Sequence, residues 1–170
     1  VPHINNSNIL GSSLQLPYFH VLSDNKDLTF KPTFFDKDIL MIQNEYRQQN
    51  KKSFFITDFN ITDGYKSKSS QKNNTLIHFF SKYESDLDFE NFIASSLDIS
   101  YQKVNNDTYL KIFDTNIVDT ELKPENFDIL TSDMELNLEH EKFSFTTGFT
   151  AYEDLSKANS DRYQYILPYY

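Results

Sequence analysis

The amino-acid sequence predicts an all-β fold, an antiparallel up-and-down meander, on three grounds. Aromatic residues make up 16% of the 170 residues, all of them Phe or Tyr, while Gly is scarce at 3; this bias favours strands. Apolar and polar residues alternate with a period of two along much of the chain, which is typical of strands with one apolar face. Short clusters of Asp, Asn, Lys and Ser separate these runs and predict tight turns, so that consecutive strands become antiparallel neighbours.

The clearest strand of the N-terminal half runs from Asp27 to Phe34. Its apolar and polar residues alternate strictly and therefore point to opposite faces: Leu28, Phe30, Pro32 and Phe34 against Asp27, Thr29, Lys31 and Thr33. The same pattern predicts further strands at 14–22, 39–48 and 54–61, joined by turns at 23–26, 36–38 and 50–52. Residues 63–74 are polar and contain Gly, Ser and Lys, which predicts a long exposed loop.

The C-terminal half repeats this pattern with longer polar connections. Strands are predicted at 75–84, 95–104, 133–139, 143–149 and 163–170, with a further uncertain one at 86–92. Residues 105–107 are suited to cap a short helical turn at 109–113. Polar loops are predicted at 114–126 and 153–161, and a tight turn at 140–142. Short turns at one end and long loops at the other are typical of a membrane barrel, although the pattern alone fits a soluble β-sandwich of this length equally well.

Composition and motifs exclude several classes of function. The net charge of −9 argues against nucleic-acid binding, which needs clustered Lys and Arg. The chain has no Cys and no purely apolar run longer than about four residues, far below the length of a membrane-spanning helix. No phosphate-binding loop or hydrolase motif is present, and the four His are scattered, so we interpret them as surface or pore-lining residues. We therefore expect no enzyme activity, no catalytic residues, no metal site and no cofactor.

Two prolines stand where strand pairing would be weakened. Pro17 lies in the middle of the predicted strand 14–22, and Pro2 lies at the start of its apparent hairpin partner. Proline has no N–H to donate to a strand ladder and is normally confined to edge strands or bulges. From the residues alone, a local weakening of the hairpin and a pair of tolerated edge prolines are equally good interpretations.

Several segments resemble, in order, the start of the barrel in the LPS-assembly (LptD, or organic-solvent-tolerance) family of outer-membrane proteins. The segments that carry the resemblance are Pro2 with 14–19 (LQLPYF), 25–32 (NKDLTFKP), 45–47 (EYR), 98–104 (DISYQKV) with 106–110 (NDTYL), and 161–165 (DRYQY) with Leu167-Pro168. Each motif is weak alone, but their order and spacing cover nearly the whole chain. The jelly-roll domain, the later barrel strands and the cysteines of the family are missing from this sequence. The resemblance therefore implies one partial outer-membrane β-barrel domain over residues 1–170, an open fragment with no second domain.

What the resemblance implies is transport of lipopolysaccharide (LPS) in the bacterial outer membrane. In the family, the sugar portion passes through the barrel lumen and the lipid leaves through a lateral gate between the first and last strands. Pro2 and Pro17 match the prolines that weaken this gate. The implied partners are LPS, an outer-membrane lipoprotein plug (LptE-like) and a periplasmic LPS bridge (LptA-like), and no bond is made or broken. The alternative is a soluble all-β carbohydrate- or ligand-binding module, a jelly roll or sandwich, which would bury its apolar strand faces against a second sheet.

Overall fold

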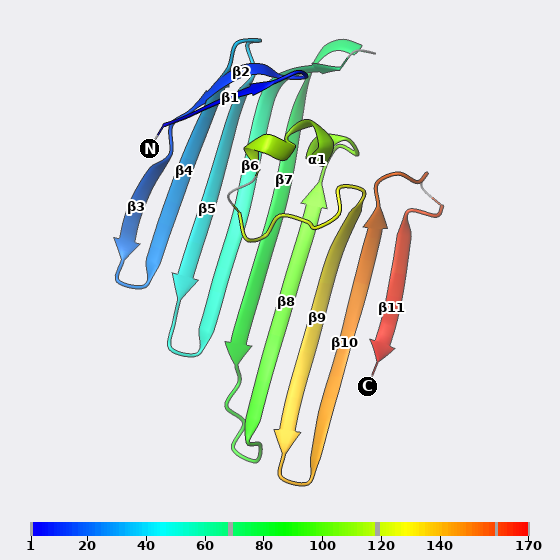
Figure 1. Ribbon diagram of the computed structural model, residues 1–170. Coiled ribbons are helices and arrows are strands. Elements are labelled where there is room, and N and C mark those ends of the chain that lie inside the picture. The colour runs from blue at the N-terminus through cyan, green and yellow to red at the C-terminus, as the bar shows by residue number, and fades with distance from the viewer. Residues whose placement is uncertain (1, 68–69, 118–119, 159, 170) are drawn as a thin grey trace.

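The computed structural model describes residues 2–67, 70–117, 120–158 and 160–169, which form a single antiparallel sheet of 11 strands (Figure 1). The strands are β1 His3–Ser7, β2 Gly11–Gln15, β3 Tyr18–Ser23, β4 Lys26–Phe35, β5 Leu40–Gln49, β6 Ser53–Ser67, β7 Ser70–Asp86, β8 Ala94–Val104, β9 Ile129–His140, β10 Phe143–Asp154 and β11 Tyr163–Tyr169. From β4 to β11 each strand pairs with the next one along the chain. The predicted all-β antiparallel meander is therefore confirmed, as an open sheet and not a closed barrel.

The predicted strand 14–22 is wrong as a single element, because the structure divides it at Leu16-Pro17. β2 pairs with the upper end of β4, where Ser13 faces Phe35, and β3 pairs with the lower end, where Tyr18 faces Phe30. The ladder continues through Leu16, whose N–H donates to the carbonyl of Pro32 at 3.0 Å. Pro17 has no N–H, and its nitrogen faces away from β4, because neighbouring residues of a strand alternate their N–H directions. Pairing with β4 resumes at Tyr18 in the same register.

The predicted loop 63–74 is also wrong, because β6 and β7 extend through most of it. Tyr65 pairs with Asn74 and Ser67 with Ser70, beyond an irregularity that contains Gly64 in a left-handed conformation with φ of 86°. Residues 68 and 69 lie outside the described part of the chain. Polar composition does not prevent a strand here, because pairing between the two extensions satisfies the backbone groups that a loop would leave to water.

The predicted strand 86–92 is the third error. β7 ends at Asp86, and an irregular connection follows, in which Asp88 adopts a left-handed conformation with φ of 56°. Asp and Asn tolerate this conformation better than other non-Gly residues, because their short side chains bond locally. The other turns lie close to their predicted places, at 24–25, 36–39, 50–52 and 141–142.

The two faces of the sheet differ in polarity and in what covers them. We call one the covered face, because the segment 105–128 packs on it, and the other the open face. In β4 the covered face carries Lys31 and Thr33, which are 7% and 0% exposed, whereas Phe34 on the open face is 50% exposed. None of the open-face residues of β4 to β7 in the described chain is buried. The apolar side of these strands is thus the uncovered one, the reverse of a soluble sheet that packs its apolar side inward.

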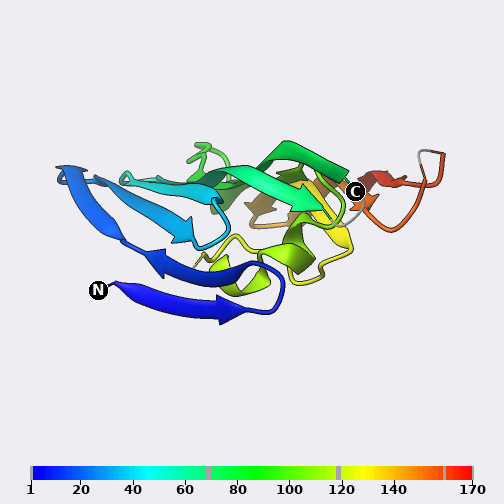
Figure 2. The same cartoon turned by 90° about the horizontal axis from the view of Figure 1, so that it is seen from above.

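The segment 105–128 forms the inner layer. It contains the short helix α1, Tyr109–Ile112, and the 3-10 turn Asp114–Asn116. Figure 2 shows that this segment and the β1–β2 hairpin lie on the same side of the sheet. The predicted helical turn is confirmed, but the cap predicted at 105–107 is not, because Thr108 is the N-cap residue and no side chain caps the helix. Asn106 accepts hydrogen bonds from the N–H and hydroxyl of Thr108 in the turn before it. The predicted polar loop 114–126 contains buried Ile117 and Leu122, so it is a packed segment and not an exposed loop.

No helix in the described residues is long and apolar enough to cross a membrane.

Candidate functional site

A buried polar network joins the segment 105–128 to the covered face. His78 on β7 lies between two partners: its Nε2 is 3.0 Å from Oδ1 of Asp58 on β6, and its Nδ1 is 2.8 Å from the hydroxyl of Tyr109 on α1. All three side chains are fully buried. The His78 ring also stacks on Phe80, with ring centroids 4.3 Å apart. Two adjacent strands and the helix are therefore connected through one imidazole.

Amide side chains extend this network along the covered face. Gln43 on β5 donates from Nε2 to Oδ2 of Asp58 at 2.7 Å. Asn60 donates from Nδ2 to the Tyr109 hydroxyl at 2.6 Å and to the Thr62 hydroxyl at 2.8 Å. The carbonyl oxygens of Gln43 and Asn60 have no hydrogen-bond partner among the described residues. Buried polar groups without partners are costly, so the network depends on each remaining bond.

This network positions the helix and cannot meet a substrate, because Asp58, His78 and Tyr109 are all closed to solvent. Burial raises the pKa of the Tyr109 hydroxyl above its ordinary range, because the charged phenolate would lose its hydration. Tyr109 therefore remains a neutral hydroxyl over the physiological pH range. The arrangement of carboxylate, imidazole and phenol is a structural connection between helix and sheet.

Apolar contacts hold the same segment more firmly than the hydrogen bonds do. Leu110, Phe113 and Ile117 are completely buried, and each such side chain contributes about 1.5–3 kcal/mol on burial. The Phe113 ring packs edge-on against Phe35 of β4 and Tyr65 of β6, with centroids 6.3 and 6.1 Å away. Undocking the segment would expose all of these groups at once. The segment is therefore a fixed inner layer of the sheet and not a mobile loop.

A pocket of about 700 Å³ lies beside α1, at the end of the sheet that carries the long connections. Its lining residues come from the β1–β2 turn, the β4–β5 turn, the end of β6 and α1: Asn8, Ile9, Lys37, Ile39, Gly64, Tyr65, Lys66, Ser67, Thr108 and Ile112. We call it the α1 pocket. Its charged lining residues are both lysines, Lys37 and Lys66, and four of the others are apolar or aromatic.

The C-terminal half of the covered face is polar and acidic. The strand register places Glu84, Asp98 and Glu135 in one row across β7, β8 and β9. A neighbouring row runs from Lys82 through Ser100 to Asp133 by the same pairing. Among the described residues, no group of three or more His, Asp or Glu is placed to hold a metal ion. This half of the face is a polar surface.

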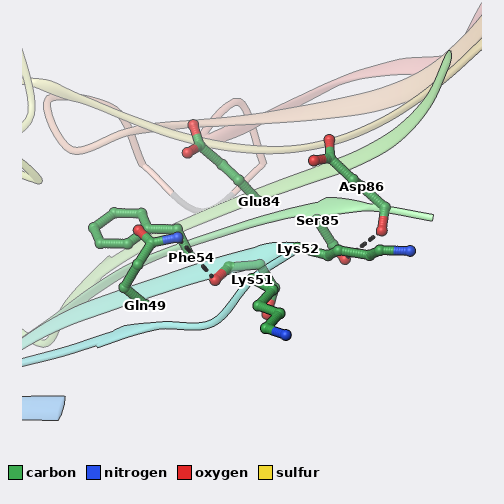
Figure 3. A pocket seen from close by; sticks show the side chains of 8 residues that line it. Gln49, Lys51, Lys52, Phe54, Glu84, Ser85 and Asp86 are labelled. Carbon is green, nitrogen blue, oxygen red and sulfur yellow. Dashed lines mark hydrogen bonds between the residues drawn. The ribbon is translucent and has the colours of Figure 1, made fainter. Parts of the chain in front are cut away.

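A shallower pocket lies at the short-turn end of the sheet (Figure 3), with a volume of about 370 Å³. Gln49, Lys51, Lys52, Glu84 and Asp86 line it, together with Ser53, Phe54 and Ser85. In Figure 3 Lys51 and Lys52 of the β5–β6 turn and Glu84 and Asp86 of β7 stand around the same hollow. Lys52 is also ion-paired with Asp88, which does not line the pocket. The described lining of this pocket thus carries charges of both signs.

The two predicted gate residues lie near one another, at one end of the β1–β2 hairpin. His3 pairs with Gln15, so Pro2 and Pro17 stand just beyond the same end of that ladder. Pro17 is half-buried and Pro2 is exposed. β3, which follows Pro17, pairs only with β4 among the described strands, so one of its edges is unpaired. Tyr18, Phe19 and Val21 on β3 are more than half exposed, at 62%, 54% and 60%.

Sequence reasoning missed the buried network. His78 is not a surface or pore-lining residue, because it is fully buried between Asp58 and Tyr109. One signal was present in the sequence: Asp58, Asn60 and Thr62 alternate with Phe59 and Ile61, which places the polar residues on one face. The partner of that face could not be read from the sequence, because it depends on where residues 105–128 fold back.

No family model matches the chain. The chain is similar to the LPS-assembly protein LptD of Legionella pneumophila strains Lens and Paris, at 27% identity over 126 residues in each case. The corresponding protein of the Philadelphia 1 strain matches equally well. The alignment covers 69% of this chain but only 15% of each relative, so the chain spans a small part of the length of these proteins. The similarity indicates a distant relation to LptD.

Proposed function

We propose that this chain forms part of the wall of an outer-membrane translocon that inserts LPS into the outer leaflet, through the barrel lumen and a lateral gate. The observation that supports this most is the opposite polarity of the two faces. Apolar side chains occupy the open face, as Phe34 and Met134 do at 50% and 47% exposure, while polar groups such as Thr33 and Asp58 occupy the covered face.

The membrane explains this polarity physically. In a transmembrane barrel, strands alternate between side chains that contact lipid and side chains that line a polar lumen. A strand needs about 9–11 residues to cross when tilted, and β8, β9 and β10 have 11, 12 and 12 residues. In this proposal residues 1–170 are one partial barrel domain, the open face contacts lipid, and the segment 105–128 lies inside the lumen.

The similarity to proteins named LPS-assembly protein LptD supports the choice of cargo. The partners we propose are LPS, a lipoprotein plug inside the barrel and a periplasmic bridge that delivers LPS to it. Transport makes and breaks no covalent bond, so we propose no enzyme activity and no cofactor. The proposed location is the outer membrane of a bacterium.

The gate is proposed at the strands that Pro2 and Pro17 adjoin, β1, β2 and β3. Leu16 donates toward β4, so the donor that Pro17 lacks belongs to the other side of its strand, where an adjoining strand would pair. β3 also has an unpaired edge among the described strands. Each missing ladder bond weakens the seam by about 1 kcal/mol. A seam weakened in this way opens more easily to let a lipid pass sideways.

The alternative, a soluble ligand-binding module, requires a second layer that packs against the open face. The described residues form one sheet, and their buried hydrophobic cluster is built around the segment 105–128. A soluble module would therefore leave Phe34, Tyr101 and Met134 in contact with water. This is unfavourable for a large contiguous patch.

Adjacent residues of β10 provide a direct test. Phe145 lies on the open face and Thr146 on the covered face, and both are exposed. A photo-crosslinking amino acid is placed at each position in the full-length protein that carries this chain, and live cells are irradiated. We expect an adduct that an antibody to LPS recognises at Thr146, and none at Phe145. Equal LPS adducts at both positions, or none at either, would contradict the proposal.

A further inference from the structure

The α1 pocket differs from the rest of the molecule in its charge. The chain has a net charge of −9, yet none of the described residues that line this pocket is a carboxylate. Lys37 and Lys66 are exposed lysines at its rim. Asp36 and Asp38 flank Lys37 in the chain without lining the pocket, and Asp36 accepts a hydrogen bond from the N–H of Ser12. The pocket is therefore a local cationic site in an acidic protein.

One of the two lysines is available to a ligand. In the part of the chain that the structure describes, Lys66 has no hydrogen bond or ion pair. Lys37 donates from Nζ to the carbonyl oxygen of Ile9 at 2.8 Å, which leaves two of its three N–H groups unused. Ile9, Ile39, Tyr65 and Ile112 form the apolar part of the lining, and Asn8, Ser67 and Thr108 add polar groups to it. A cationic rim above an apolar floor matches a ligand with a charged head and an apolar body.

The walls of the pocket are preformed. Thr108 and Ile112 flank Tyr109, which the bonds to His78 and Asn60 hold against the sheet. On the opposite wall, Gly64 approaches the β4–β5 turn so closely that a Cβ at this position would lie 2.3 Å from the carbonyl oxygen of Asp38. Ligand sites are commonly pockets of about 300–1,000 Å³ that exist before the ligand arrives. The volume of the α1 pocket, about 700 Å³, lies within this range, and the contacts of Tyr109 and Gly64 hold its walls in place.

We propose that the α1 pocket binds the phosphorylated sugar end of the lipid portion of LPS during its passage. A phosphate is held between Lys37 and Lys66, and the adjoining part of the acyl chains lies on Ile9, Ile39, Tyr65 and Ile112. The volume of about 700 Å³ accommodates one sugar phosphate and the start of its chains, not a whole LPS molecule. The inference rests on the proposed function, and it identifies the α1 pocket as the place on the covered face where LPS binds.

The experiment measures binding of bisphosphorylated lipid A to the full-length protein in detergent micelles. The test variant is Lys37→Gln with Lys66→Gln. The matched control is Lys51→Gln with Lys142→Gln, which removes the same charge from two exposed turn lysines at the other end of the sheet. We expect the test variant to bind about tenfold more weakly, since each exposed ionic contact contributes a two- to fivefold effect. The control should remain within twofold of the unmodified protein.

A second variant, Ile9→Glu, places a carboxylate in the pocket and leaves both lysines intact. Ile9 is 55% exposed, so the change does not disturb packing, and we expect a similar loss of lipid A binding. Micelles containing phosphatidylglycerol form the comparison arm, in which the lysine variant should have less than a twofold effect. An equal loss for phosphatidylglycerol would mean that the pocket binds any lipid phosphate, and the assignment to LPS would be wrong.

Unchanged lipid A binding in the Lys37→Gln, Lys66→Gln variant would overturn the pocket assignment. LPS delivery to the cell surface is measured in parallel with the unmodified protein. Delivery without any effect of the pocket variants would reject only the pocket. Absence of both delivery and lipid A binding in the unmodified protein would reject the proposed function itself.

Discussion

The hydroxyl of Tyr109 lies 2.8 Å from Nδ1 of His78, and this contact joins the helix of the inner segment to the seventh strand of the sheet. The residues are 31 positions apart in the chain. Asn60 on β6 donates to the same hydroxyl, so Tyr109 is hydrogen-bonded to both β6 and β7. The apolar neighbours of Tyr109 supply most of the docking energy, and the hydroxyl specifies where the helix sits.

Substitution of Tyr109 by Phe should destabilise the docked segment by about 1–3 kcal/mol, because it leaves the buried side chains of His78 and Asn60 short of a partner. Hydrogen exchange of the backbone amides at 109–117 measures the effect. Tyr101→Phe is the control: Tyr101 is on the open face and 45% exposed, so its change should stay within about 0.5 kcal/mol. Equal exchange in both variants would show that the hydroxyl does not contribute.

Alkaline pH should loosen the same segment. Burial raises the pKa of Tyr109 in the docked state, so its contribution is complete below the ordinary tyrosine pKa of about 10 and is lost as the pH rises above it. The reason is that only the undocked tyrosine can ionise there. Exchange at 109–117 is followed between pH 8 and about 11. Tyr109→Phe should remove part of the pH dependence, and an unchanged pH dependence in that variant would assign it to other groups.

Arginine on the open face should destabilise the barrel in lipid. Met134→Arg is expected to cost about 2–4 kcal/mol if the position lies near the bilayer midplane, measured by unfolding of the full-length protein in lipid vesicles. Asn137→Arg is the control on the covered face of the same strand, where the pairing with Ser96 and Thr146 places it among polar neighbours. If the chain were a soluble module, Met134→Arg should change the free energy of unfolding little, because Met134 is 47% exposed to water and can accept a charge at little cost. Equal stability of the two variants would argue against a lipid-facing surface.

Replacing Pro2 and Pro17 together by Val or Ala should tighten the proposed gate. Two restored donors of about 1 kcal/mol each shift the opening equilibrium about tenfold or more. Surface LPS should fall and the outer membrane should become leakier, with normal levels of assembled barrel. Pro124→Ala is the control, because Pro124 lies in the segment 105–128, outside the strands, and its replacement restores no ladder donor. Normal LPS delivery by the double variant would mean that these prolines are merely tolerated.

The alternation of side chains and the short turns were sufficient to predict the meander. Both are local properties: residues i and i+2 of a strand share a face, and a turn of two to four residues makes its flanking strands neighbours. The run from Leu28 to Phe34 was therefore divided correctly into an apolar and a polar side. The helical turn at 109–113 was predicted on equally local grounds, from polar residues suited to precede it.

Tertiary structure alone decided which of these sides is covered. The alternation is the same whether Phe34 or Thr33 faces inward, and the outcome, with Thr33 fully buried and Phe34 half exposed, depends on the return of the segment 105–128 to the polar side. The burial of His78 has the same origin, since it depends on Tyr109, 31 positions away. The strand extensions at 63–67 and 70–74 depend instead on pairing with each other. Local sequence determines what a strand presents on each face, and packing between distant segments determines what each face meets.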